Sequence, residues 1–142
     1  MPDLTDHGPN PYVLDIEEAT LGNDNFRSTL WTGSLLQLTV MSIPVGGDVG
    51  LEQHPENDQF LRLEQGRALV EMGSAKDQLT FREEVSADWA ILVPAGTWHN
   101  VTNIGESPMK LYALYGPAHH PHGTVHATQE EAEEAEAAEN DH

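Results

Sequence analysis

The sequence predicts an all-β protein that folds as a single antiparallel β-barrel and ends in an acidic C-terminal tail. A length of 142 residues suits one domain with one core. Between residues 26 and 117, short runs rich in β-branched and aromatic residues alternate with turn signals about every 8–12 residues. No helical periodicity of any length interrupts that stretch. This combination is typical of an all-β sandwich or barrel.

The chain divides into an arm, a barrel and a tail. Residues 1–25 are expected to form an N-terminal arm, because prolines, Asp and Asn surround a single short apolar patch at residues 12–16. Residues 26–117 are expected to form the barrel, with turns such as those at 44–47 and 94–96. Its predicted strands are residues 26–31, 35–43, 51–54, 59–64, 68–72, 79–84, 89–93, 99–103 and 109–115.

Residues 118–142 are predicted to be a histidine-containing loop followed by the acidic tail. Thr128 and Glu131 have the spacing of a capping box, and the Ala/Glu composition that follows favours a helix. Because alanine is the only apolar residue there and like charges repel at i, i+4, we expect a solvated, frayed helix or disorder. A partner-binding or cation-binding tail is the alternative. At most one short helix is expected in the chain, in this tail.

The charge balance excludes several classes of partner. Twenty-four Asp and Glu residues face six Lys and Arg residues, which gives a formal charge of −18. Such a field repels phosphate backbones and anionic membranes, so neither nucleic acid nor a membrane is expected as a partner. The chain has only two lysines, and without the seven acids of the tail it still carries a formal charge of −11. We therefore expect a salt-adapted, halophilic protein whose stability rises with salt; the alternative is an ordinary acidic protein with an acidic tail.

Further exclusions follow from what the sequence lacks. It has no cysteine, so disulfides, thiolate metal sites and cysteine nucleophiles are excluded and a cytoplasmic location is favoured. It has no apolar run near 18 residues and no N-terminal leader pattern, which argues against a membrane span and a secretory signal. Motifs of serine nucleophiles, phosphate loops and zinc peptidases are also absent. Any metal must be held by His, Asp, Glu, Gln or Asn.

The residues that carry chemistry form a candidate metal site. Glu52 and His54 are two residues apart in a predicted strand, so their side chains are expected on one face, and Gln59 and His99 begin two other predicted strands. Two imidazoles and one carboxylate can bind a divalent first-row metal (Mn, Fe, Ni, Co or Zn) and leave positions open for a substrate. Gln59 would be a neutral fourth donor. Asp58 is the second choice for its place, because it points to the opposite face of an extended strand.

The same residues carry a resemblance to the cupin superfamily, whose members are small jelly-roll barrels with two motifs that together make a metal site. The first cupin motif reads Gly, five residues, His-x-His, three or four residues, Glu, six residues, Gly. The second reads Gly, five residues, Pro-x-Gly, two residues, His, three residues, Asn. The matching positions are Gly46, Glu52, His54, Gln59 and Gly66 for the first motif, and Asp88, Pro94, Gly96, His99 and Asn103 for the second. The resemblance covers about residues 35–116.

The departures from these motifs are informative. Glu52 stands where the first motif has its leading histidine, and Gln59 stands where it has glutamate. The site therefore resembles two His, one Glu and one Gln, with the formal ligand charge of the family unchanged. Asp88 replaces the first glycine of the second motif. Cupin phosphomannose isomerases similarly use two His, one Glu and one Gln, and their Gln-x-His-Pro segment looks like residues 53–55.

The resemblance implies an isomerase or epimerase in which the metal is a Lewis acid for a small polar sugar-like or keto/hydroxy substrate. Glu52 and Tyr112 are the expected proton-transfer residues. An iron-dependent dioxygenase and a non-catalytic metal-binding or small-ligand-binding cupin are the alternatives. Cupin barrels pair through edge strands or arms, so a homodimer is expected.

Further residues are assigned less directly by the sequence. We expect the barrel mouth to be lined by Met41, Trp98, Tyr112 and Tyr115. Arg27 is the first candidate for holding an anionic substrate group, although an exposed or ion-paired arginine is the simpler interpretation. The role of the loop histidines is left open, with a second metal site as one hypothesis. These histidines are His119, His120, His122 and His126.

Overall fold

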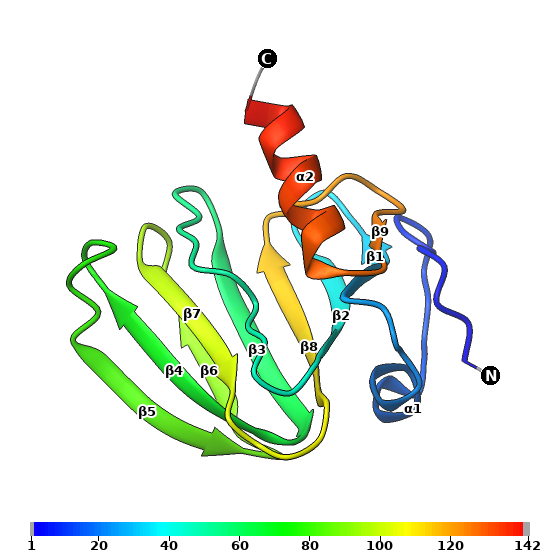
Figure 1. Ribbon diagram of the computed structural model, residues 1–142. Coiled ribbons are helices and arrows are strands. Elements are labelled where there is room, and N and C mark those ends of the chain that lie inside the picture. The colour runs from blue at the N-terminus through cyan, green and yellow to red at the C-terminus, as the bar shows by residue number, and fades with distance from the viewer. Residues whose placement is uncertain (1, 141–142) are drawn as a thin grey trace.

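Two antiparallel sheets face each other and form a jelly-roll barrel, as the sequence predicts (Figure 1). The computed structural model describes the backbone of residues 2–140 and the side chains of residues 2–137. The larger sheet has the strand order β6-β3-β8-β2-β1-β9 and the smaller sheet has the order β5-β4-β7. The strands are β1 (Arg27–Thr32), β2 (Gln37–Ile43), β3 (Asp58–Gln65), β4 (Arg67–Gly73), β5 (Phe81–Ser86), β6 (Ala90–Val93), β7 (Trp98–Asn103), β8 (Met109–Gly116) and β9 (Val125–His126).

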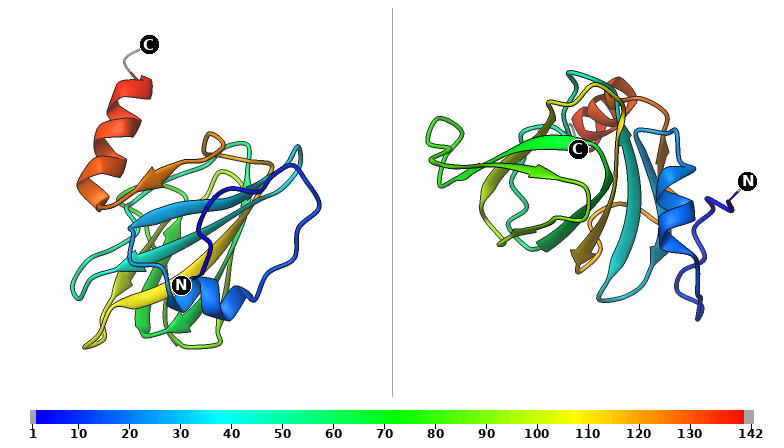
Figure 2. Two further views of the ribbon diagram at one scale, coloured as in Figure 1. Left: turned by 90° about the vertical axis from the view of Figure 1, so that its right-hand side faces the viewer. Right: turned by 90° about the horizontal axis from the view of Figure 1, so that it is seen from below.

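The core lies between the two sheets and follows the period-two alternation of the strands. In β8, the buried residues Met109, Leu111, Ala113 and Tyr115 all belong to the main core. Tyr112 and Leu114, which alternate with these residues, point to the other face of the sheet. The right-hand view of Figure 2 shows the sheets curving around this core.

Eight of the nine predicted strands are present, with boundaries that agree within two residues. The prediction of a strand at 51–54 is wrong: the segment is a loop held by one isolated bridge between Glu52 and His99. Strand β9 was not expected, and it extends the larger sheet by pairing with β1. A two-residue strand carries no periodicity that a sequence pattern could reveal.

The arm contains a helix, α1 (Ile16–Leu21), so the expectation of at most one helix, in the tail, is wrong. Asp15 caps this helix by accepting a hydrogen bond from Glu18 N at 3.1 Å. Buried Ala19 packs into a second apolar cluster with Leu38 and Val40 of β2. The helix therefore covers the outer face of the larger sheet, beside β2 (Figure 2).

The acidic tail is also more ordered than the sequence suggests. Its helix, α2 (Gln129–Asn140), begins at the predicted cap, where Glu131 N donates to Thr128 Oγ1 at 3.2 Å. The helix is not wholly solvated, because Ala132 is buried in the main core and Gln129 donates to Asp48 at 2.9 Å, although Glu130, Glu131, Glu133 and Glu134 are exposed. Helix α2 stands over one end of the barrel (Figure 1). In the described part of the chain, no helix is long and apolar enough to cross a membrane.

Candidate metal centre

The predicted donors gather at the end of the barrel that α2 covers. In the β3–β8 register Gln59 lies opposite Tyr115, so the start of β3 meets the end of β8 at this end. His99 is the second residue of β7, which also begins here. The connection between β2 and β3 brings Glu52 and His54 to the same place, because Glu52 and His99 exchange two backbone hydrogen bonds of 3.0 and 2.9 Å. This end of the barrel is called the mouth below.

The loop with Glu52 and His54 is held by the turn of the second motif. Gln53 donates from its side chain to Gly96 O at 2.9 Å, and Gly96 N donates to His54 O at 2.9 Å. The side chains of Glu52 and His54 therefore converge although the two residues are not in a strand. His54 Nε2 lies 3.1 Å from Glu52 Oε2. Asp58 is used differently: its carboxylate is exposed and accepts a hydrogen bond from Ala95 N at 2.9 Å.

The imidazole of His54 is the centre of the cluster. The residue is 4% exposed, and neither ring nitrogen makes a hydrogen bond of acceptable geometry, although Nε2 lies 3.1 Å from Glu52 Oε2. Buried polar atoms are nearly always paired, so two unpaired nitrogens on one ring indicate a position kept for a ligand. Around it lie the rings of His99 at 5.3 Å, His119 at 4.1 Å and Tyr115 at 5.7 Å, measured between centroids.

His99 is held in the tautomer that a metal ligand needs. Its Nδ1 lies 3.0 Å from Thr97 O, and since a carbonyl oxygen only accepts, Nδ1 carries the proton. The lone pair of the neutral ring is then on Nε2. A backbone carbonyl that fixes the ring in this way is a common feature around metal-binding histidines.

Gln59 has the expected place and an available oxygen. The residue is 6% exposed, and its Oε1 accepts no hydrogen bond. An amide oxygen buried without a donor costs free energy unless a ligand uses it. Gln59 therefore fits the role of a neutral donor at the inner edge of the cluster.

The structure brings to this centre a histidine, His119, that the sequence analysis assigned only to a possible second site. One ligand atom from each of Glu52, His54 and His119 lies within 4.8 Å of the other two, and this is the one such group among the described residues. His119 follows β8 directly, and β8 ends at the mouth opposite Gln59. Its position soon after the predicted strand at 109–115 was the one signal in the sequence that could have identified it.

The buried histidines are neutral at neutral pH. Burial lowers the pKa of His54 below its ordinary 6.5, and the positive charge of Arg27 acts in the same direction against the opposing effect of Glu136. Burial also lowers the pKa of His99, although the Thr97 carbonyl partly offsets it. Neutral imidazole is the form that binds a metal, so both rings are ready as ligands without losing a proton.

The two tyrosines of β8 lie on opposite faces. Tyr115 is fully buried beside His54, and burial raises its pKa to about 12. Tyr112, expected to transfer a proton and to line the mouth, instead packs on the outer face with the cluster around α1 and beside Phe60. It is not brought to the metal centre. Of the other residues expected at the mouth, Met41 is buried in the main core, whereas Trp98 lines the cavity there.

Arg27 is buried close to the site, 2% exposed, and is neither surface-exposed nor ion-paired with a described carboxylate. One of its terminal nitrogens lies 3.4 Å from His126 Nδ1, and its Nε has no partner. It lines a small cavity of about 120 Å³ beneath α2. Its charge faces the carboxyl groups described next.

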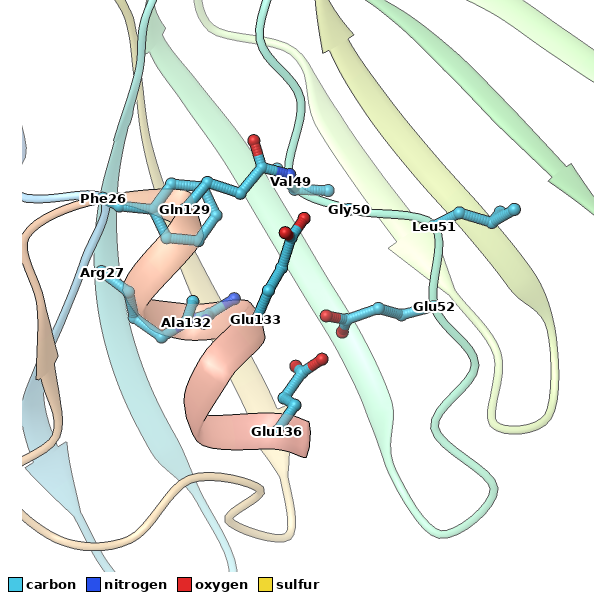
Figure 3. A pocket seen from close by; sticks show the side chains of 10 residues that line it. All are labelled: Phe26, Arg27, Val49, Gly50, Leu51, Glu52, Gln129, Ala132, Glu133 and Glu136. Atoms are coloured by element: carbon cyan, nitrogen blue, oxygen red, sulfur yellow. The ribbon is translucent and has the colours of Figure 1, made fainter. Parts of the chain in front are cut away.

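Helix α2 brings acidic side chains over the mouth. Figure 3 shows Glu136 of the helix pointing toward Glu52, while Glu133 lines the same small cavity and points toward Gly50. Burial raises the pKa of Glu136 to about 7, and its hydrogen bond with Glu52 and the charge of Glu52 add to that effect. The mouth is thus closed on one side by a carboxyl that keeps its proton to an unusually high pH.

The remaining loop histidines do not form a second centre in the described chain. His120 and His126 line a cavity of about 180 Å³ with His119 and Glu136, but their nitrogens do not converge as a group of three. Burial, with the nearby Arg27, lowers the pKa of His120 to about 2. His122 lies apart from the mouth and contacts Gly8 O at 2.9 Å.

Comparisons with known proteins agree with this architecture. The Cupin domain family matches residues 39–115. The uncharacterized protein YrkC of Bacillus subtilis (strain 168) is 56% identical over 133 residues, which cover 94% of this chain and 72% of that protein. The crystal structure of BH2720 from Bacillus halodurans has a TM-score of 0.91 at 60% identity and covers 92% of this chain and 98% of that one. The structure of KdgF from Halomonas sp., at 19% identity and a TM-score of 0.57 over 66% of this chain and 78% of that one, shares the fold alone.

Proposed function

The chain belongs to the cupin family, and on this premise we propose that it is a divalent-metal-binding enzyme acting on a small polar substrate. The observation that carries the proposal is the unpaired, buried ring of His54, which has a carboxylate oxygen at 3.1 Å and a second imidazole on either side. A barrel that binds no ligand would normally have apolar or fully hydrogen-bonded side chains at this position. Both ring nitrogens of His54 and the side-chain oxygen of Gln59 have no hydrogen bond, and His54 lies beside a carboxylate, which favours an ion.

The residues present fit a first-row divalent metal. Glu52 and His54 would supply a carboxylate and an imidazole, and His99, whose ring centroid is 5.3 Å from that of His54, would be the second imidazole. Gln59 would offer an amide oxygen. His119, which the structure places within reach of Glu52 and His54, is the further candidate. Nitrogen and oxygen donors of this mixture suit Mn, Fe, Co, Ni or Zn. A metal held there would supply a Lewis acid for a carbonyl or hydroxyl oxygen of the substrate.

The chain's own residues would bind and orient the substrate. The mouth opens into a cavity of about 420 Å³, which is within the range of roughly 300–1,000 Å³ that small-molecule sites occupy. The carboxyls of Glu52 and Glu136 line it and can accept or return a proton. A sugar-like or keto/hydroxy substrate isomerised or epimerised at a carbon next to the bound oxygen matches this lining.

Metal content is the first test. Protein purified without chelator is expected to hold close to one divalent ion per chain, measured by elemental analysis. His54→Ala and His99→Ala should each lose most of it, whereas Gln59→Ala should retain much because it removes a weak donor. His122→Ala is the matched control, since its ring lies outside the centre. Equal metal content in the parent and both histidine variants would contradict the centre.

The reaction class is tested with the metal-loaded protein. Turnover of aldose–ketose or epimer pairs, followed by chiral chromatography, is the result expected of an isomerase. Oxygen consumption by an anaerobically loaded Fe(II) sample, only with substrate present, would identify a dioxygenase instead. Tight metal or ligand binding without turnover on either panel would identify a non-catalytic cupin.

A further inference from the structure

Lys76 lies at the rim of the mouth, on the hairpin between β4 and β5. Gly73 pairs with Trp98 in the β4–β7 register, so the hairpin continues past the start of β7 and over the mouth. The ammonium of Lys76 lies 5.0 Å from the centre of the Trp98 ring. Both side chains line the cavity of about 420 Å³, together with Glu52, His54 and others.

The charge of Lys76 is not neutralised. In the described part of the chain, Arg62, Arg82 and Lys110 pair with carboxylates. Among the described residues, Lys76 has no carboxylate within 4 Å and makes no hydrogen bond, although the chain contains 24 acidic residues. Arg27 and Arg67 also have no ion pair with a described carboxylate. Lys76 differs from them because it lines the cavity at the mouth together with Glu52 and His54.

The hairpin tip holds Lys76 in place. Gln78 N donates to Ala75 O at 3.0 Å, and the side chains of Ser74 and Gln78 meet at 3.4 Å. Gly73 is required at the base, because a Cβ there would lie 1.8 Å from Gln78 O. The indole of Trp98 then supports the lysine by a cation–π contact and leaves the three N–H groups of the ammonium for another partner.

We propose that Lys76, supported by Trp98, binds a carboxylate of the substrate, so that the substrate is a small hydroxy or keto acid. The proposal rests on the function proposed above and names its substrate class. A single carboxylate matches the single charge of Lys76. A phosphate dianion would meet Glu52 and Glu136 in the same cavity with one more negative charge, and it would find one exposed cation at the rim.

Binding measurements on Mn²⁺-loaded protein test this inference. The probes are lactate and gluconate, each beside its neutral amide, lactamide and gluconamide, and inorganic phosphate, all titrated by calorimetry. At least one acid is expected to bind the parent more tightly than its amide by roughly three- to tenfold, the worth of one charged contact near the surface. Lys76→Gln should abolish that preference, and Lys76→Arg should restore part of it. Arg82→Gln makes the same change of charge on the exposed side of β5 and should leave the preference intact.

The outcomes separate the two proposals. Metal content is measured for each sample by elemental analysis. Normal metal content with no acid preference that depends on Lys76, including no binding of either acid, overturns the carboxylate inference and leaves the metal centre standing. If the protein holds no Mn²⁺ and still shows an acid preference that depends on Lys76, the carboxylate inference is supported and the proposed metal centre is contradicted. Phosphate binding that depends on Lys76, with no acid preference, overturns the substrate class.

Discussion

The outer face of the larger sheet and the mouth of the barrel differ in whether their buried polar groups are hydrogen-bonded. Under α1, buried Asn23 donates to Asn25 O at 2.8 Å and accepts from Asn25 N and Ser28 Oγ, and Lys110 pairs with Asp24 at 2.9 Å. The buried side-chain atoms without a hydrogen bond lie instead on the inner face or at the mouth. In the described part of the chain they are Arg27 Nε, Thr39 Oγ1, both ring nitrogens of His54, Gln59 Oε1 and His120 Nε2.

The hydrogen-bonded groups stabilise the fold, whereas the unpaired groups are available to bind a ligand. Each unpaired buried group costs roughly 1–3 kcal/mol of folding free energy. A small protein can tolerate several unpaired polar groups at the mouth only if its other buried polar groups are hydrogen-bonded. The hydrogen bonds on the outer face therefore help to offset the free-energy cost of the unpaired groups at the mouth.

The largest expected effect is a loss of stability of the metal-free protein as pH falls. His54, His99 and His120 have a lowered pKa in the folded chain, so below pH 6.5 the unfolded chain binds more protons. Each therefore removes at most about 1.4 kcal/mol per pH unit as pH falls. Glu136, whose pKa is raised to about 7, acts in the opposite sense between about pH 4.5 and 7. The net loss is at most about 2.7 kcal/mol per pH unit.

Denaturant unfolding between pH 6.5 and 5 measures this slope. Glu136→Gln should steepen it, because the opposing group is gone, and His120→Gln should make it shallower. If the free energy of unfolding of the metal-free protein did not change over this interval, the buried histidines at the mouth would not be held in the neutral form, contrary to the comparison made above.

The second effect tests the outer face. Asn23→Ala should destabilise the protein by about 2–4 kcal/mol, since it leaves several groups of Asn25 and Ser28 without partners. Asn10→Ala, at an exposed position, is the control and should stay within about 0.5 kcal/mol. Thermal or denaturant unfolding gives both values. A loss for Asn23→Ala no larger than for Asn10→Ala would show that pairing under α1 adds little.

The smallest effect sharpens the comparison at the mouth. Gln59→Leu keeps the size of the side chain and removes an oxygen that has no donor, so the metal-free protein should lose no stability and gain up to about 1 kcal/mol. The same variant should bind metal less tightly. A destabilisation above about 2 kcal/mol would mean that Gln59 has a structural partner.

Much of the fold could be predicted because strand alternation is a local property. It placed Gln59 and His99 inside the barrel, and two spaced motifs gave the cupin family, which the comparisons confirm. Glu52 and His54 meet for a different reason than predicted. They lie in a loop that the turn at Gly96 holds, and no period-two pattern describes that contact.

The missed parts depend on tertiary contacts. Helix α1 has six residues, too few for a periodic signal, and α2 docks through Ala132, whose burial cannot be distinguished from simple helix propensity. His119 is held near the site because His119 N and His120 N donate to the side-chain oxygen of Gln37 at 3.0 and 2.9 Å, a contact that no motif encodes. The dimer and the salt adaptation stay predictions, tested by mass in solution and by unfolding at graded salt.

All the donors lie at one end of the barrel, which leaves the opposite end free for engineering. The turn at residues 104–108 joins the end of β7 to the start of β8, and both strands have their mouth residues at the other extremity. Glu106 is exposed in that turn, whereas Asn103 and Gly105 hold its base by a hydrogen bond of 2.9 Å. A reporter peptide or a surface-attachment tag inserted beside Glu106 would sit a full strand length from the metal centre and would leave access to the mouth unobstructed.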